Sequence, residues 1–296
     1  MLPVNVILVN YKNDELTINC IRALERGSLK PHQIFVIDNQ SSESSRSHFK
    51  EQTFSLPVKF IWNEKNLGFA AGCNQGIRAS QESGFNGFIW LLNNDAEPDV
   101  HALKEIVLKA ELSGAAITGS QVTDESGIFI GGVGLIHPRF ASVHRPKNCD
   151  CQQFDYVEGS SFLISPQCLE TIGFLSEDFF LYFEESDYCF KARKAGLKLA
   201  WATHSIIRHR IGASTGSEIA KGKVPFFIDC IMVRNRIHFA LTNHFSKSGV
   251  FFGLFLSLLL RIKRKQFSRV LKILSISTSE KRFRKFVVQN GGYFEK

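Results

Sequence analysis

The alternation of short apolar runs with helix-like segments over the first hundred residues constrains the fold more than any other feature. Four runs have the apolar, β-branched character of buried parallel strands, at residues 4–9, 33–38, 58–62 and 87–92. Helical patterns lie between or after them, at residues 14–26, 74–83 and 98–112. This alternation predicts a parallel sheet with helices on both faces, which is a Rossmann-like, three-layer α/β sandwich.

The second half of the chain follows a different pattern. Short strands and glycines between residues 117 and 164 predict an antiparallel edge or an inserted ribbon. We expect a helix at residues 181–196 and a further strand at residues 198–207. A helical stretch follows the strand. We therefore expect an α/β domain of residues 1–225 and a C-terminal helical extension of residues 226–296.

The net charge of +8 is concentrated at the end of the chain. Residues 261–296 hold eleven Lys and Arg against two acidic residues, whereas residues 1–260 hold 25 basic and 26 acidic residues. A near-neutral body without a nucleic-acid module argues against a nucleic-acid partner. The seven cysteines are scattered and form no CxxC pair, which indicates a reducing, cytoplasmic location.

An apolar stretch at residues 250–260 runs directly into a basic cluster at residues 261–265. The stretch is too short to span a bilayer, which takes about 20 apolar residues. We expect an interfacial helix whose basic flank is attracted to anionic lipids, so that the protein is peripheral on the membrane. A helix that packs into the core or into a homodimer is the alternative.

Polar residues gather where the expected strands end. In open α/β sheets ligands bind outside the carboxyl ends of the strands. An aspartate there can bind a nucleoside or a hard divalent cation, or it can simply cap a turn. The residues concerned are Asn10–Tyr11, Asp38–Asn39, Asn93–Asn94–Asp95 and His209.

Two further segments add chemistry to this edge. A glycine-containing loop around Gly68 opens a helix near Asn74 and can cradle phosphate, although its spacing is not GxGxxG. The acidic group of Glu184, Glu185 and Asp187 follows a run of aromatic residues. Three carboxylates within four positions indicate either a reaction site or the start of a helix, where the helix dipole favours acidic residues.

Taken in order, these segments resemble the motifs of family 2 glycosyltransferases, and in particular their bacterial rhamnosyltransferase-like branch. The resemblance covers roughly residues 4–240 and implies a GT-A fold, an inverting transfer from a nucleotide-sugar and a divalent metal. It rests on residues 6–11, 36–41, 66–74, 91–95, 158–160 and 179–187, with Arg234–Asn235 as a recurring pair beyond them.

By this resemblance, the cofactor-binding residues that would hold the dTDP- or UDP-sugar are Asn10, Tyr11, Asp38, Asn39, Gly68, Asn74 and Asn94. Asp95 matches the last acid of a DxD-like motif and would bind Mg²⁺ or Mn²⁺ together with His209. The catalytic base falls on Glu185, where the family commonly has Asp. Asp187 is the competing base, and its alternative role is an ion pair with Lys191 one helical turn away.

The resemblance then predicts a cytoplasmic hexosyltransferase at the inner face of the cell membrane. It would add a sugar, such as rhamnose, to a lipid-linked glycan acceptor that becomes part of a surface glycan. Two other functions remain open from the sequence alone. One is a non-catalytic sugar- or lipid-binding protein on the same fold, and the other is a nucleotidyltransferase.

Overall fold

A nine-stranded mixed sheet forms the middle of the computed structural model, which describes residues 1–40, 42–148, 151, 153–209 and 224–294. Most of the sheet follows the order β3-β2-β1-β4-β11-β6-β12-β5, and β7 pairs with β6. Its strands are β1 (Val4–Asn10), β2 (Gln33–Asn39), β3 (Val58–Asn63), β4 (Phe88–Asn93), β5 (Ala96–Pro98), β6 (Ile117–Thr123), β7 (Phe129–Gly131), β11 (Ser161–Ile164) and β12 (Leu199–His209). A small second sheet contains β8 (Val133–Ile136), β9 (Val143–His144) and β10 (Tyr156–Val157).

The four predicted parallel strands are confirmed. β1 pairs in parallel with β2 and β4, and β2 pairs in parallel with β3, so these strands end at one edge. The antiparallel segment is also present, in two parts. Strand β11 runs antiparallel between β4 and β6 inside the large sheet, and β8, β9 and β10 form a separate antiparallel ribbon.

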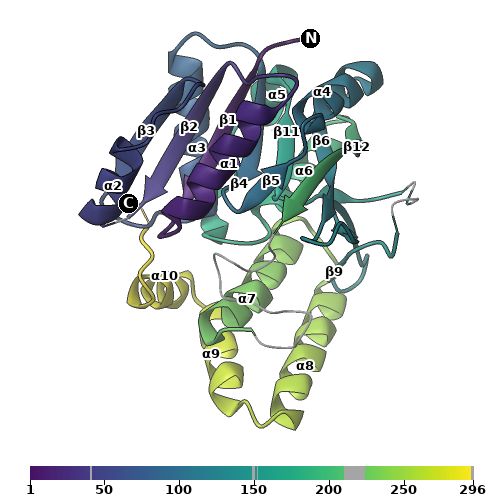
Figure 1. Cartoon of the computed structure of the whole chain (residues 1–296). Helices are drawn as coiled ribbons and strands as arrows, with labels where there is room; N and C mark the ends of the chain where they lie inside the picture. The colour runs from purple at the N-terminus through teal and green to yellow at the C-terminus, as the bar shows by residue number, and fades with distance from the viewer. Residues whose placement is uncertain (41, 149–150, 152, 210–223, 295–296) are drawn as a thin grey trace.

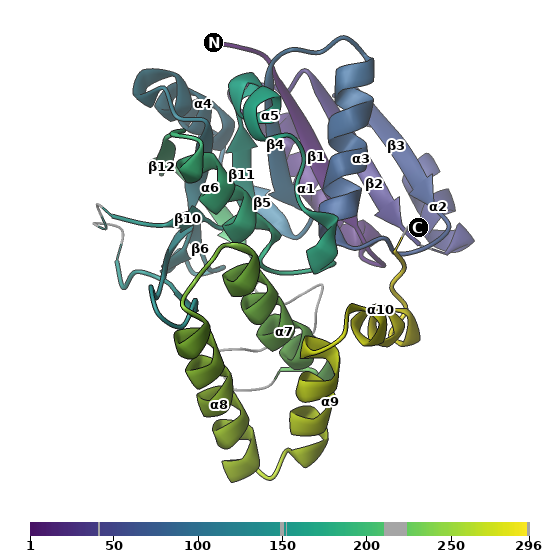
Figure 2. The ribbon, with the colours of Figure 1, turned by 180° about the vertical axis from the view of Figure 1, so that it is seen from behind.

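Helices cover both faces of the sheet. Helices α1 (Asp14–Arg26) and α4 (Ala102–Ser113) pack on one face, and α3 (Phe69–Glu82) and α6 (Glu184–Lys194) pack on the other, near α5 (Pro166–Ile172). Figures 1 and 2 show these two faces in turn. Gly76 allows α3 to approach β1, because a Cβ atom there would lie 2.6 Å from Cγ2 of Ile7.

One helix was not expected, and another begins earlier than expected. Helix α2 (Glu43–Lys50) was not predicted, because its sequence is almost wholly polar. Its start is stabilised by Ser42, whose side chain accepts a hydrogen bond from the backbone of Ser45. Helix α3 begins at Phe69 rather than near residue 74.

The C-terminal extension consists of α7 (Phe226–Thr242), α8 (Lys247–Lys263), α9 (Phe267–Ser277) and α10 (Glu280–Gln289). It lies below the edge at which β1 and β2 end (Figure 1). Asp229 of α7 forms ion pairs with Arg261 of α8 and Arg269 of α9, which ties the three helices together. Within the described ranges, no helix is both long and apolar enough to cross a membrane.

Candidate active site

A buried polar network lies where β1 and β2 end. The register of the two strands places Asn10 opposite Asp38, and Nδ2 of Asn10 donates to Oδ1 of Asp38 at 2.8 Å. Nδ2 of Asn94 donates to Oδ1 of Asn10 at 3.2 Å, and the hydroxyl of Thr17 donates to the same oxygen at 2.9 Å. Asn10 and Asp38 are fully buried. The network therefore fixes the orientation of Asp38, and Thr17 is a member that sequence reasoning missed.

The glycine loop closes against the aromatic segment ahead of α6. Gly68 has a φ of +88°, and a Cβ atom there would lie 2.4 Å from the carbonyl oxygen of Phe180. The backbone N–H of Phe69 donates to that same oxygen at 2.8 Å. Nδ2 of Asn39 donates to the carbonyl of Gly68 at 2.9 Å, so the loop is held from β2 as well. Only glycine fits this position, because it lacks the clashing Cβ and tolerates positive φ.

Two predicted nucleotide-binding residues have different surroundings from the rest. Asn74 is buried and turned towards the segment before α6: its Nδ2 donates to the carbonyl of Leu175 at 2.9 Å and to Glu177 at 2.7 Å. The structure does not bring its side chain together with the Asn10–Asp38 network. Tyr11 is partly exposed at the rim, with Nζ of Lys12 4.9 Å from its ring centre.

The two predicted metal ligands meet. Nε2 of His209, at the end of β12, lies 2.9 Å from Oδ1 of Asp95, and Nδ2 of Asn93 lies 3.1 Å from the same nitrogen. Both Asp95 and His209 line a cavity of about 210 Å³, together with Arg22 and Arg208. The pair thus combines a carboxylate oxygen with an imidazole nitrogen beside several cationic side chains.

A short loop, residues 158–160, links this pair to the acidic helix. The N–H of Asn93 donates to the carbonyl of Ser160 at 3.1 Å, and a Cβ atom on Gly159 would lie 3.9 Å from Cβ of Glu185. Glu158 is buried and paired with Arg145. Sequence reasoning missed this pair, because Arg145 lies in an irregular segment with no periodic signal.

Burial changes the proton affinity of the carboxylates at this edge. It raises the pKa of the half-buried Glu185 to about 7, and repulsion from the charge of Glu158 acts in the same direction. Burial also raises the pKa of Glu158, against the attraction of Arg145. Glu184 is fully enclosed, and burial together with its neighbour Glu185 raises its pKa well above the ordinary range. Glu185 is therefore the accessible member of this group, poised to titrate near neutral pH.

Asp187 points away from this group. Its carboxylate accepts a hydrogen bond from Nδ2 of Asn243, directly after α7, at 2.9 Å and lies 2.6 Å from Nζ of Lys191. The ion pair with Lys191 is the alternative that the i, i+4 spacing indicated. Asp187 is buried, and it joins α6 to α7.

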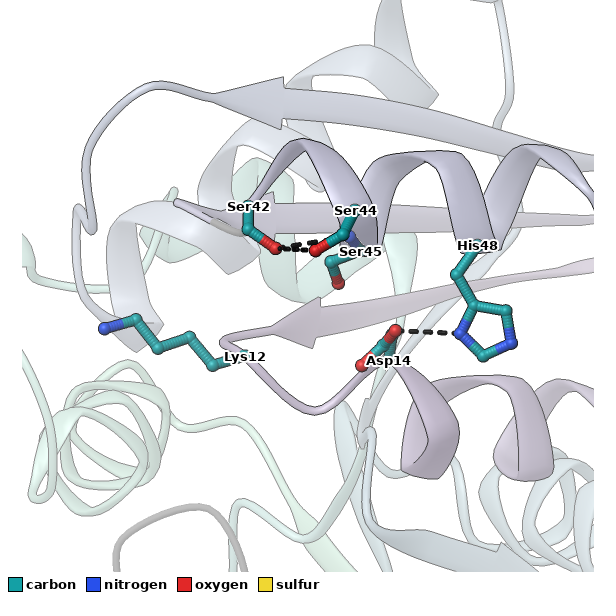
Figure 3. A pocket seen from close by; sticks show the side chains of 6 residues that line it. All are labelled: Lys12, Asp14, Ser42, Ser44, Ser45 and His48. Atoms are coloured by element: carbon teal, nitrogen blue, oxygen red, sulfur yellow. Dashed lines mark hydrogen bonds and ion pairs between the residues drawn. The ribbon is translucent and has the colours of Figure 1, made fainter.

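A separate cavity of about 460 Å³ lies between the starts of α1 and α2. Figure 3 shows its walls, where Asp14 contacts His48 and Ser42 contacts Ser44. Lys12 also lines it. None of the residues predicted for the nucleotide, the metal or the base is among those that line it.

Comparison with known proteins gives a family for this chain. The family described as Glycosyl transferase family 2 matches residues 5–193. The low-salt glycan biosynthesis hexosyltransferase Agl10 of Haloferax volcanii is 25% identical over 206 residues, which cover 66% of this chain and 63% of that protein. The chain therefore spans somewhat less than two thirds of the length of this relative.

Solved structures show the same fold at low identity. GalNAc-T7 with UDP, GalNAc and Mn²⁺ has a TM-score of 0.59 at 16% identity, over 81% of this chain and 48% of its own. S. aureus TarS 1–349 in complex with UDP-GlcNAc has a TM-score of 0.55 at 12% identity, over 98% and 75%. The mannosyltransferase PcManGT of Pyrobaculum calidifontis, with GDP-Man and Mn²⁺, has a TM-score of 0.53 at 13% identity, over 98% and 87%. The expected GT-A fold is confirmed, and because the family match covers well over half of the sequence, the chain belongs to glycosyl transferase family 2.

Proposed function

We propose that the chain is a metal-dependent, inverting glycosyltransferase that moves a sugar from a nucleoside diphosphate to an acceptor hydroxyl. The observation that carries this proposal is the loop of residues 158–160. Ser160 accepts a hydrogen bond from Asn93, beside the Asp95–His209 pair, and Gly159 lies next to Glu185, whose Cβ would be 3.9 Å from a Cβ atom at residue 159. A group able to bind a diphosphate and a group able to accept a proton therefore lie at one edge of the sheet, as displacement of a diphosphate by a hydroxyl requires.

Asp95 and His209 are the residues that would hold Mg²⁺ or Mn²⁺. In the described part of the chain, no cluster of three or more His, Cys, Asp or Glu side chains could hold a metal. Two protein ligands suit Mg²⁺, which is usually bound by one or two carboxylates plus substrate phosphates, and the imidazole also suits a transition metal such as Mn²⁺. When bound, the ion offsets the charge that develops on the leaving diphosphate.

Glu185 is the proposed base. Its raised pKa of about 7 lets it hold a proton taken from the acceptor hydroxyl and release it again near neutral pH. The hydroxyl oxygen attacks the anomeric carbon from the face opposite the diphosphate, the bond to the diphosphate breaks, and the configuration inverts. No covalent intermediate is needed. We assign Asp187 a structural role, because its carboxylate is engaged by Lys191 and Asn243.

The donor would lie along the ends of β1 and β2. Asn10, Asp38 and Asn94 form the network beneath it, and Tyr11 with the Gly68 loop forms the rim. The solved relatives were captured with UDP or with UDP- and GDP-sugars. For this chain we propose a dTDP- or UDP-sugar, and we retain rhamnose or another deoxyhexose as the sugar on the motif resemblance.

The acceptor is proposed to be a lipid-linked glycan at the inner face of the cell membrane. The support comes from α8, whose outer surface is apolar and exposed although the helix cannot span a bilayer. Exposed lysine and arginine side chains lie at residues 263–265, at the C-terminal end of this helix. They would be attracted to anionic lipids. The apolar residues concerned are Phe251, Phe252, Phe255, Leu256, Leu259, Leu260 and Ile262.

The test is a turnover assay with a panel of dTDP-, UDP- and GDP-sugars, with Mn²⁺, with Mg²⁺ and with a chelator. We expect metal-dependent release of nucleoside diphosphate that falls by about 10²- to 10⁴-fold in Glu185→Gln, the range typical of a lost general base. Glu170→Gln, an exposed carboxylate on α5, is the matched control. Full turnover in Glu185→Gln would remove Glu185 from the mechanism. Binding of a donor without turnover by the unmodified protein would favour a non-catalytic sugar-binding protein.

A further inference from the structure

The segment that follows α10 returns to the edge of the sheet. In Figures 1 and 2 it runs from α10 towards α2 and the end of β2. The N–H of Tyr293 donates to the carbonyl of Asn66 at 2.7 Å, and Asn66 pairs with Gly292 as an isolated parallel bridge. Asn66 belongs to the loop between β3 and α3, whose Gly68 N–H donates to Oδ1 of Asn66 at 3.0 Å. Residues 292 and 293 are thus paired with the glycine loop through Asn66.

The contact is closely packed. A Cβ atom on Gly292 would lie 2.5 Å from Cζ of Phe180 and 2.4 Å from Cγ1 of Val287. The ring of Phe294 lies 5.8 Å from that of Phe180 and 5.8 Å from that of Phe283, measured between ring centres. The backbone of residue 292 can approach Phe180 and Val287 this closely only because glycine has no side chain.

The same segment also reaches the opposite rim. Gly291 has a φ of +86°, and a Cβ atom there would lie 3.7 Å from the hydroxyl of Tyr11, the residue directly after β1. Nζ of Lys65 lies 4.0 Å from the ring centre of Tyr293. Residues 291–294 therefore lie between Tyr11 and the glycine loop, which are the two sides of the proposed nucleoside site.

We infer that residues 291–294 form a wall of the donor pocket and position Tyr11 and the Asn66–Gly68 loop for the nucleoside. This inference rests on the proposed function. The segment contacts no residue of the Asp95–His209 pair or of the Glu185 group by any hydrogen bond or ring contact described for it. Its direct effect therefore falls on donor affinity, and only its packing on Phe180 connects it to the segment ahead of α6.

The first test is a pair of variants in the full chain, with UDP, dTDP and GDP as probes in the presence of Mn²⁺. Gly292→Val would displace the segment, and Tyr293→Ala would remove the ring beside Lys65 and leave the backbone bond. We expect Gly292→Val to weaken binding of the preferred nucleotide by about tenfold, which corresponds to about 1.4 kcal/mol. It should raise KM for the donor by a larger factor than it lowers kcat, because Phe180 is the only contact of the segment with the loop ahead of α6 that these distances give. Tyr293→Ala should weaken binding less. Val288→Ala, on the exposed side of α10, is the matched control.

The second measurement needs no variant. Hydrogen exchange of residues 291–294 in the unmodified protein should slow when the nucleotide and Mn²⁺ are added. Equal or tighter binding by Gly292→Val, or unchanged exchange on nucleotide binding, would overturn the inference and leave the proposed function intact. If the unmodified protein binds no nucleoside diphosphate, the proposed function fails and the inference fails with it.

Discussion

Asn235 of α7 donates its side-chain amide to the carbonyl oxygen of Tyr182, at 3.1 Å, two residues before the acidic helix begins. The same amide also contacts the carbonyl oxygens of Phe179 at 2.7 Å and Leu181 at 2.9 Å. This loop contains unusual backbone: Tyr182 has a φ of +70° and Phe183 a φ of +79°. Each left-handed non-glycine residue costs about 1–2 kcal/mol. Asn235 stabilises the conformation that delivers Glu185 to the edge of the sheet.

The first prediction concerns this clamp. Asn235→Ala should lower the free energy of unfolding by about 1–3 kcal/mol, because it leaves buried carbonyl oxygens without their donor. It should also lower kcat, since Glu185 loses its fixed position, with little change in donor affinity. Asn243→Ala is the matched control, because Asn243 caps the C-terminal end of the same helix but contacts Asp187. Urea unfolding and steady-state kinetics separate the two effects. An equal loss of kcat in both variants would show that α7 contributes only general stability.

The second prediction is a pair of opposite pH dependences. The native state keeps the proton of Glu185 up to about pH 7, whereas an unfolded chain releases it near the ordinary pKa of 4.5. Between these values the unfolded state binds fewer protons, so the free energy of unfolding falls as pH rises. Glu185, the proposed base, can accept a proton only when it is ionised. We therefore expect kcat/KM to rise with pH through about 7.

Urea unfolding and kcat/KM measured from about pH 5 to pH 8 check both slopes. Glu185→Gln should make the stability less dependent on pH, although Glu158 and Glu184, whose pKa values burial also raises, would keep part of the slope. A rate that is constant across neutral pH would argue that another group accepts the proton.

That the strands preceding Asp95 and ending in Asn10 and near Asp38 stop at one edge could be predicted from the sequence. Each of these residues follows a short apolar run, and neighbouring parallel strands bring their carboxyl ends together. The observed register bears this out, with Asn10 opposite Asp38 and Val9 opposite Asn93. The same reasoning predicted His209, because it follows an expected strand, and in the structure it is the last residue of β12.

The orientation of Asn74 could not be predicted in this way. Its proximity in sequence to Gly68 suggested a place in the donor loop, but α3 begins at Phe69, so Asn74 lies more than one helical turn beyond it. Its side chain faces Leu175 instead. The pairing of Arg145 with Glu158 depends on irregular segments, in which no periodicity records which residues meet.

The third prediction tests the metal pair. Asp95→Asn and His209→Ala should each weaken Mn²⁺-dependent binding of the nucleoside diphosphate by at least about 10- to 100-fold, the loss that even outer partners of metal ligands produce. After chelation, both variants and the unmodified protein should bind the nucleotide equally weakly. The two substitutions should be non-additive, because they remove parts of one site. Asp99→Asn, an exposed carboxylate nearby in sequence, is the control. Calorimetric titration that finds additive losses would argue against a shared metal.

The fourth prediction distinguishes Asp187 from Glu185. Asp187→Ala removes one of the two acceptors of the buried Asn243 amide and leaves only the carbonyl of Phe239, so the free energy of unfolding should fall by about 1–3 kcal/mol. Turnover per folded molecule should stay near that of the unmodified protein. Lys191→Met is a useful companion, because it leaves the buried carboxylate of Asp187 without its cation and should also lower the free energy of unfolding, with turnover per folded molecule unchanged. A loss of turnover in Asp187→Ala as large as that in Glu185→Gln, at a temperature where both are folded, would restore Asp187 as the base.

The fifth prediction concerns the outer surface of α8. Arg261 was expected to face lipid, but it is engaged by Asp229, so the attraction would fall to the exposed side chains of residues 263–265. Phe252→Ser combined with Phe255→Ser should leave the free energy of unfolding nearly unchanged, because both rings are at least half exposed. It should weaken binding to anionic vesicles by at least about tenfold, since burying one such ring contributes about 1.5–3 kcal/mol.

Vesicle sedimentation at low and high salt checks this prediction against the homodimer alternative. If the surface binds lipid, neutralising residues 263–265 should lower binding to anionic vesicles. Added salt should lower it too, because exposed charges are screened within about 8 Å at physiological ionic strength. A dimer surface would give another outcome. The unmodified protein would sediment as a dimer without vesicles, the phenylalanine substitutions would make it monomeric, and vesicle binding would be absent in both. The double substitution thus acts on lipid affinity in one case and on self-association in the other.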